Sequence, residues 1–305
     1  MKVASLDFGS NTFLCLIAET DGKSFQKIYR DESRVVRLSE GVAITGYISD
    51  SALQRAETAI IEFRKIIDEE NKKNKIDKIL GVTTAVARQS SNSEAFYDLL
   101  KKYNLPIQLL SGSEEADITF QGAISGMTNK NNLLVIDIGG GSTEVIFGNN
   151  NIKLHAHSFD FGVVRLKDKF NVNNPISPEL IVKLKDYIST QTKVFMEFIN
   201  SKHIIENIVA VAGTPTSLAA IELGGYDPAK VDGYVFNLEK LETWFTTLSQ
   251  LSPEQITKTY GVESGRADVL AIGVLILIEI LKLANAEKLK VSIRGVRYGV
   301  ALWIA

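Results

Sequence analysis

The feature that most constrains the fold of this 305-residue chain is a short motif that occurs twice. DFGSNT (residues 7–12) and DIGGGST (residues 137–143) each follow one apolar run and precede another. An aspartate at a strand end, followed by glycine and small hydroxyl residues in a hairpin, places a carboxylate beside backbone N–H groups that no Cβ covers. The repeat therefore predicts two duplicated domains, each with a phosphate-binding hairpin, that face one cleft.

Strand-like and helix-like patterns alternate along the chain. The predicted strands are residues 2–6, 13–18, 79–82, 107–110, 133–138, 144–147, 208–211 and 289–293. From Leu53 to Ile67 apolar side chains recur at steps of three and four, with Asp50 as the expected cap. Two further helices are expected after Pro178 and over residues 267–284. This alternation predicts α/β layers rather than a β sandwich.

Length and composition favour two domains. The chain carries 45% hydrophobic residues, which is enough for two cores. We expect one domain over residues 1–121 plus 297–305 and a second over residues 122–296. Tight hinges are expected near residues 122–126 and near Gly295, because no glycine-rich or proline-rich linker separates the halves.

Charge and apolar runs exclude several classes of protein. The net charge is −2 with both signs interspersed, so neither a nucleic-acid partner nor a membrane surface is expected. The single cysteine, Cys15, lies in an apolar segment, which excludes an internal disulfide and predicts a buried thiol. No secretory signal is visible and the longest apolar run, residues 269–278, is too short to span a bilayer, so the expected compartment is the cytoplasm.

The two hairpins carry the residue types that a metal-bridged phosphate requires. Asp7 and Asp137 are the expected magnesium ligands, directly or through water. The hydroxyl and amide groups expected to donate to phosphate oxygens belong to Ser10, Asn11, Ser142 and Thr143. Either hairpin alone is also compatible with an ordinary glycine turn, and the matched pair is what favours phosphate. The pattern is neither a Walker A loop nor a dinucleotide fingerprint, because a strand follows the glycines.

Several longer segments resemble one known family. They are DFGSNTFLCLIAE, RVVRLSEGV, TTAVARQSSN, SGSEEADITFQGAISG, LLVIDIGGGSTEVIFG, FGVVRLKDKF, AVAGTPTSLAAI and GRADVLAIG. In that order they resemble the exopolyphosphatase and guanosine pentaphosphate phosphohydrolase family, in its short form. The resemblance implies an α/β fold of two actin-like, ribonuclease H-like domains around a central cleft. The stretch SIRGVR resembles the family's terminal glycine motif only loosely.

The resemblance also implies roles for individual residues. Glu115, the second glutamate of SGSEEAD, corresponds to the family's catalytic carboxylate, which orients and deprotonates the attacking water. Asp137 corresponds to the magnesium carboxylate, and Glu144 to a second acidic position that helps hold the ion or its water. Arg88 corresponds to a basic residue that neutralises the transferred phosphoryl group. The residues expected to cradle the phosphate are Gly140, Gly141 and Ser142.

Other residues in these segments have competing interpretations. Glu114 is expected to do no more than favour the start of a helix, where negative charge is stabilised. Three arginines in family-like segments are compatible either with a polyphosphate channel or with structural roles: Arg34, Arg165 and Arg294. His155 and His157 alternate on an expected strand, which favours packing over a metal site.

The resemblance implies Mg²⁺-assisted hydrolysis of the terminal phosphoanhydride of inorganic polyphosphate, of guanosine pentaphosphate, or of both. Two alternatives remain open from the sequence: an ATP-dependent small-molecule kinase with the same hairpins, and a non-catalytic regulator that binds a guanosine alarmone. A homodimer is expected only because relatives commonly form one.

Overall fold

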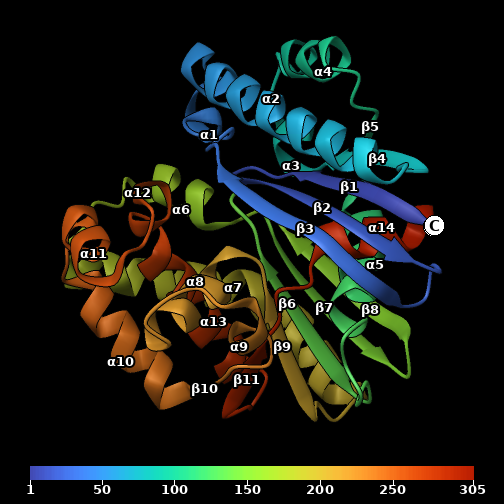
Figure 1. The fold of residues 1–305 in the computed structure, drawn as a ribbon. Coiled ribbons are helices and arrows are strands. Elements are labelled where there is room, and N and C mark those ends of the chain that lie inside the picture. Colours follow the sequence, from blue (N-terminus) through green and yellow to red (C-terminus); the bar gives the residue numbers. More distant parts are fainter. The chain divides into compact units, whose positions relative to one another are not determined.

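The computed structural model describes residues 1–305, which form two compact units (Figure 1). Unit 1 consists of residues Met1–Gly126 and Arg294–Ala305, and unit 2 of residues Met127–Ile293. The sequence placed these boundaries after residues 121 and 296. Those positions fall inside helix α5 (Gly112–Ile124) and after the first residue of helix α14 (Val296–Ile304), so the observed units keep both helices whole.

Unit 1 is built on a five-stranded sheet in the order β3-β2-β1-β4-β5. β1, β2 and β3 are antiparallel neighbours, whereas β4 and β5 run parallel to β1. The strands are β1 (Lys2–Phe8), β2 (Thr12–Thr20), β3 (Phe25–Val35), β4 (Lys78–Thr83) and β5 (Ile107–Leu109). Strand β3 was not predicted, because it lies at the sheet edge and most of its side chains are exposed or half-buried.

Helices cover both faces of this sheet (Figure 1). The helices on one side are α1 (Val42–Thr45), α2 (Asp50–Lys73), α3 (Ala85–Gln89) and α4 (Ser93–Lys102). Phe63 of α2 and Phe96 of α4 pack onto Phe8 and Phe13 in one fully buried cluster. The predicted α2 helix is present, but Ser49 is its cap, because the Ser49 side chain accepts a hydrogen bond from Ala52 N.

The other face of the sheet is covered by α5 and α14, which come from distant parts of the chain. Tyr298 and Ala301 of α14 pack on strands β1 and β2, while Val296 and Val300 pack with residues of β4 and α5. The two helices approach closely, because a Cβ on Gly299 would lie 1.9 Å from the carbonyl oxygen of Ile118. Gly122 lies within α5, where a Cβ would stand 2.2 Å from the carbonyl oxygen of Gly295.

Unit 2 has a six-stranded sheet in the order β10-β11-β9-β6-β7-β8, which repeats the topology of unit 1 and adds β10, antiparallel to β11, at one edge. β6, β7 and β8 are antiparallel neighbours, and β9 and β11 continue parallel to β6. The strands are β6 (Leu133–Ile138), β7 (Thr143–Asn149), β8 (Ile152–Phe159), β9 (Asn207–Val211), β10 (Val235–Asn237) and β11 (Lys288–Val291). Shared strand order and directions in both units confirm the predicted duplicated, actin-like α/β fold.

One large core holds unit 2 together. Helix α13 is buried along nearly its whole length, and Leu184, Ile188 and Met196 of α7 join the same cluster. The helices are α6 (Val163–Phe170), α7 (Pro178–Lys202), α8 (Gly213–Glu222), α9 (Pro228–Val231), α10 (Leu238–Ser249), α11 (Pro253–Tyr260), α12 (Ser264–Ala267) and α13 (Leu270–Leu283). The helix predicted over residues 267–284 is present as α13, which begins at Leu270 after a turn at Asp268 and Val269, and Asp268 forms an ion pair with Lys167.

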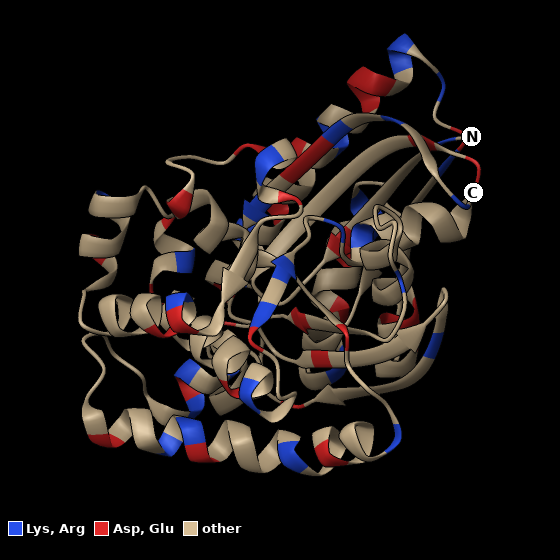
Figure 2. Cartoon of the chain, turned by 90° about the horizontal axis from the view of Figure 1, so that it is seen from below, with Lys and Arg blue, Asp and Glu red and all other residues tan.

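Burial and charge agree with the sequence interpretation. Cys15 is fully buried in unit 1, and burial raises the pKa of its thiol to about 12. Lysine and arginine are interspersed with aspartate and glutamate along both units (Figure 2). Apolar helices as long as a bilayer crossing are not found in the structure.

Candidate phosphate-binding and catalytic residues

Hairpin 1, residues 8–13 of unit 1, joins β1 to β2. Asp7 is half-buried near the end of β1, and Ser10 in the loop is 5% exposed. The loop is fixed by its own carbonyl groups: the oxygen of Asn11 accepts hydrogen bonds from the N–H groups of Val36 and Arg37, each 2.9 Å long. The segment after β3 therefore holds the predicted phosphate-binding residues Ser10 and Asn11 in a defined loop.

Hairpin 2, residues 138–143 of unit 2, joins β6 to β7 and is more enclosed. Ser142 is 5% exposed, and Gly139 N donates to the Ser142 carbonyl oxygen over 3.0 Å. Thr143 is fully buried and its hydroxyl donates to the carbonyl oxygen of Phe161 over 2.8 Å. That bond braces the hairpin, so the Thr143 hydroxyl is engaged inside the protein, whereas Gly140, Gly141 and Ser142 form the turn itself.

The start of helix α6 braces hairpin 2 from behind. The backbone N–H of Val163 donates to the carbonyl oxygen of Gly139, and those of Val164 and Arg165 both donate to that of Gly140, over 2.9–3.1 Å. Gly162 allows this approach, because a Cβ there would stand 2.5 Å from the Gly139 oxygen. Three backbone hydrogen bonds from the start of α6 therefore hold the hairpin.

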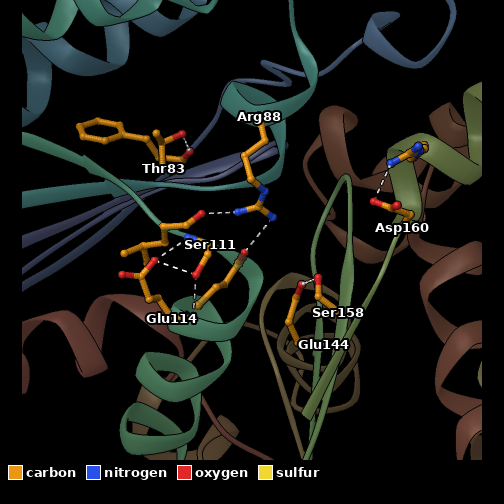
Figure 3. A network of polar contacts seen from close by, with 11 residues as sticks. Thr83, Arg88, Ser111, Glu114, Glu144, Ser158 and Asp160 are labelled. Atoms are coloured by element: carbon orange, nitrogen blue, oxygen red, sulfur yellow. Dashed lines mark hydrogen bonds and ion pairs between the residues drawn. The ribbon is translucent and has the colours of Figure 1, made fainter. Parts of the chain in front are cut away.

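Two carboxylates lie side by side next to hairpin 2. Asp137 and Glu144 are direct partners in the antiparallel β6–β7 register, so their side chains share one face of the sheet. Asp137 is 7% exposed and Glu144 is 2% exposed. The hydroxyl of Ser158 on β8 donates to Glu144 Oε1 over 2.6 Å, as Figure 3 shows. Sequence reasoning missed Ser158.

This pair of carboxylates fits a magnesium ion. Two buried, adjacent negative charges repel each other, and a divalent cation would offset that cost. The structure contains no group of three or more histidine, cysteine, aspartate or glutamate side chains arranged for a metal. Mg²⁺ is commonly held by one or two carboxylates, with water and substrate phosphate completing its shell. The donor set is therefore one that suits Mg²⁺ better than zinc.

In unit 1 the predicted catalytic residues Glu115 and Arg88 lie together. Arg88 sits in the last turn of α3, and Glu115 in the first turn of α5. Arg88 donates through Nη1 to the carbonyl oxygen of Leu110, and its Nη2 lies 3.4 Å from Glu115 Oε2 (Figure 3). The Glu115 side chain is only 8% exposed, whereas that of Arg88 is 29% exposed. A buried carboxylate is thus paired with a partly accessible guanidinium group.

The neighbouring carboxylate has a different role. Glu114 closes a capping box with Ser111, because Glu114 Oε2 accepts from Ser111 N over 2.8 Å and from Ser111 Oγ over 2.7 Å (Figure 3). Hydrogen bonds from the Ser111 backbone and hydroxyl lower the pKa of the Glu114 carboxyl. Glu114 therefore starts α5, as the sequence suggested, and holds Glu115 in the first helical turn.

The three uncertain arginines occupy different surroundings. Arg34 on β3 forms ion pairs with Glu62 and Glu32, so it belongs to a surface charge cluster of unit 1. Arg294, also in unit 1, lies beside Gly126 and over the Tyr298 ring. Arg165 lies in the first turn of α6, where its backbone N–H donates to Gly140 of hairpin 2, and its side chain pairs over 3.3 Å with Asp160, whose side chain is 86% exposed.

The three histidines of unit 2 lie against aromatic side chains. His155 and His203 are joined through their Nε2 atoms over 3.0 Å, and His203 stacks on Phe147. Burial and the neighbouring His203 lower the pKa of His155. His157 packs against Phe159 and Phe195.

The predicted AVAGTPTS turn contains a strained residue. Ala212 precedes α8 with φ 71° and ψ −163°, a region that is ordinarily reserved for glycine. Thr214, two residues after Ala212, is packed tightly against Gly273 of α13, where a Cβ would lie 2.1 Å from Thr214 Oγ1. The sequence signal for this site was the strand-to-glycine turn, but nothing in the sequence marked Ala212 itself.

Comparison with known proteins identifies the family of this chain. Residues 16–304 match the Ppx/GppA phosphatase family. A bifunctional 3-dehydroquinate synthase/phosphatase from Fusobacterium nucleatum is 32% identical over 95% of this chain, which spans 44% of that protein's length. Exopolyphosphatase 2 from Mycobacterium tuberculosis is 26% identical, with 100% of this chain and 98% of the relative covered. The crystal structure of an exopolyphosphatase from Cytophaga hutchinsonii is 25% identical, covers 100% of this chain and 97% of its own, and superposes with a TM-score of 0.90. The chain belongs to the Ppx/GppA phosphatase family.

Proposed function

We propose that this protein hydrolyses the terminal phosphoanhydride bond of inorganic polyphosphate, of guanosine pentaphosphate, or of both, in a Mg²⁺-dependent reaction. The observation that carries the proposal is the pairing of a buried carboxylate, Glu115, with a partly exposed arginine, Arg88, in a member of a phosphatase family. A buried base beside a guanidinium group suits attack by water on an anionic phosphoryl group.

The proposed division of work follows the two groups of residues. Hairpin 2 would bind the terminal phosphate through its backbone N–H groups, which the α6 start keeps rigid. Bound beside Asp137 and Glu144, Mg²⁺ would supply charge neutralisation for the phosphate oxygens. Glu115 would orient the water and accept its proton as the oxygen bonds to phosphorus and the bridging oxygen leaves with the shortened chain.

The Arg88 contact with Glu115 has two consequences for this reaction. The guanidinium group favours the ionised form of Glu115, which is the form that accepts a proton. Arg88 has five N–H donors and uses one for the carbonyl oxygen of Leu110 and one for Glu115, so other N–H groups of the same side chain can donate to a phosphate.

The deciding experiment measures phosphate release with Mg²⁺ from long-chain polyphosphate and from guanosine pentaphosphate in parallel. Glu115→Gln should lower the rate of release by roughly 10²–10⁴-fold, the usual contribution of a general base. Glu114→Gln is the matched control, because it changes the adjacent carboxylate on the same helix turn, keeps a side-chain acceptor for the capping box with Ser111 and should retain release. The substrate that the wild-type protein prefers decides whether its main activity is on polyphosphate or on guanosine pentaphosphate.

Three results would contradict the proposal. If Glu115→Gln retains full hydrolysis, Glu115 is not the base. If the wild-type protein releases phosphate from neither substrate but binds the guanosine compound tightly, the protein is a regulator. Transfer of phosphate from ATP to a small acceptor, without release of free phosphate, would identify a kinase instead.

A further inference from the structure

We infer that Ser158 is a positioning residue for the Glu144 carboxylate in the proposed magnesium site. This inference rests on the proposed function for its relevance, but its test is independent of turnover. Three residues lie in a row across three adjacent strands of unit 2. Asp137 on β6 is the register partner of Glu144 on β7, and Glu144 is the register partner of Ser158 on β8. All three side chains therefore occupy the same face of the sheet.

A β-bulge decides which β8 side chain meets Glu144. The β7–β8 turn contains only Asn150 and Asn151, both with positive φ, and next to it Gly148 pairs with Lys153. The register then shifts, because Phe147 pairs with His155 and Leu154 is the extra residue. Without this shift the partner of Glu144 would be His157.

The consequence of the bulge is chemical. A one-residue slip would reverse the faces of the rest of β8 and place an imidazole opposite Glu144 in place of a hydroxyl. His157 instead packs on the opposite face, against Phe159 and Phe195. The fold thus presents to the carboxylate a small, uncharged donor that cannot take up a proton or compete as a metal ligand of comparable strength.

The hydrogen bond is short and the acceptor is buried. Ser158 Oγ donates to Glu144 Oε1 over 2.6 Å, which is the length of a charge-assisted O–H···O⁻ bond. Glu144 is 2% exposed, and Ser158 is half-buried on β8, the edge strand of the sheet. The donor therefore lies on the side of Glu144 that faces the edge of the sheet. A glutamate side chain has three rotatable bonds, and a donor fixed on the neighbouring strand selects one orientation of its carboxylate. Donors of this kind, behind a metal ligand, commonly raise metal affinity.

The test uses the full-length protein and Mn²⁺ as a spectroscopic substitute for Mg²⁺. Binding of Mn²⁺ is titrated by electron paramagnetic resonance without any phosphate substrate. Ser158→Ala should weaken Mn²⁺ binding by roughly 10–100-fold. Ser158→Thr keeps the hydroxyl and should restore most of the affinity. Ser249→Ala is the matched control, because Ser249 is a buried serine of α10 that donates to a backbone carbonyl and should leave Mn²⁺ binding unchanged.

A second readout separates positioning from a general loss of structure. The Mg²⁺ concentration for half-maximal phosphate release should rise for Ser158→Ala by the same factor as the Mn²⁺ constant, while release at saturating Mg²⁺ stays close to wild type. Three results would overturn the inference: wild-type Mn²⁺ affinity in Ser158→Ala, equal weakening in Ser158→Thr, or wild-type binding no stronger than that of Glu144→Gln. If Mn²⁺ binding depends on Ser158 but the wild-type protein releases no phosphate, the proposed function is contradicted and this inference is not.

Discussion

Replacing Gly162 by alanine should break the support of hairpin 2. Gly162 has φ −142° and ψ −178°, an extended conformation that alanine adopts without strain, so any effect must come from the added methyl group. That Cβ would lie 2.5 Å from the Gly139 carbonyl oxygen and 2.6 Å from both the carbonyl carbon and oxygen of Gly140. These are backbone atoms, and no rotamer change can relieve the overlap.

The size of the effect follows from the hydrogen bonds behind the hairpin. Ordinary contact begins near 3.4 Å, so the two segments must separate by 0.9 Å (3.4 − 2.5). The three bonds from the N–H groups of α6 to Gly139 and Gly140, now 2.9–3.1 Å long, would then exceed hydrogen-bonding distance. At about 1 kcal/mol each, their loss costs about 3 kcal/mol. For a domain of this size that corresponds to a fall in Tm of roughly 6–12 °C.

Thermal unfolding and phosphate release, measured on the same preparation, test this reasoning. A shift of about 1 Å in a binding loop is expected to lower the rate roughly 10²-fold. Gly213→Ala is the control for stability, because no atom lies within 4 Å of the Cβ it would add. Its Tm should equal or exceed that of the wild type. A Gly162→Ala protein with unchanged Tm and unchanged phosphate release would show that hairpin 2 does not depend on this contact.

Three further changes test other parts of the structure. Ala212→Gly should stabilise the protein by about 1 kcal/mol in urea unfolding, because it relieves a strained backbone, whereas Ala210→Gly in strand β9 should destabilise it. Burial alone would raise the pKa of Glu222, but hydrogen bonds from Lys240, Trp244 and Tyr234 lower it. The ionised Glu222 carboxylate therefore contributes its full stabilisation of the folded protein above about pH 4.5, and this contribution is lost as the pH falls further. Glu222→Gln should therefore flatten the fall in Tm below that pH, and an unchanged slope would contradict the assignment. Asp160→Asn should free Arg165 and lower the KM for polyphosphate at low salt, with no difference at high salt and an unchanged Tm.

The sequence predicted those parts of the structure that depend on local patterns. Hairpins 1 and 2 form at the two aspartate–glycine motifs, and Glu114 starts a helix as its neighbours indicated. Each hairpin is encoded within about ten consecutive residues, so strand propensity and glycine placement suffice to locate it. The capping box is likewise contained in four residues.

What escaped prediction depends on contacts between distant segments. Ser158 faces Glu144 only because of the bulge at Leu154, and counting back from the two-asparagine turn would have selected His157. The need for glycine at position 162 arises from backbone that lies more than twenty residues earlier in the chain. Edge strand β3 was missed for another reason: its exposed side chains remove the alternation that reveals a half-buried strand.

The division of unit 1 between the two ends of the chain has a consequence for how the protein is made. Residues 1–126 emerge from the ribosome first, yet the face of their sheet that receives Tyr298 and Ala301 cannot be covered until α14 has been synthesised. At about 5–20 residues per second the intervening chain takes roughly 9–36 s to make. Unit 2 is continuous and can close during that delay. The docking of α14 would then follow the closing of unit 2: Arg297 donates to Asp31, and the carbonyl oxygen of Arg297 accepts a hydrogen bond from the Ser5 hydroxyl.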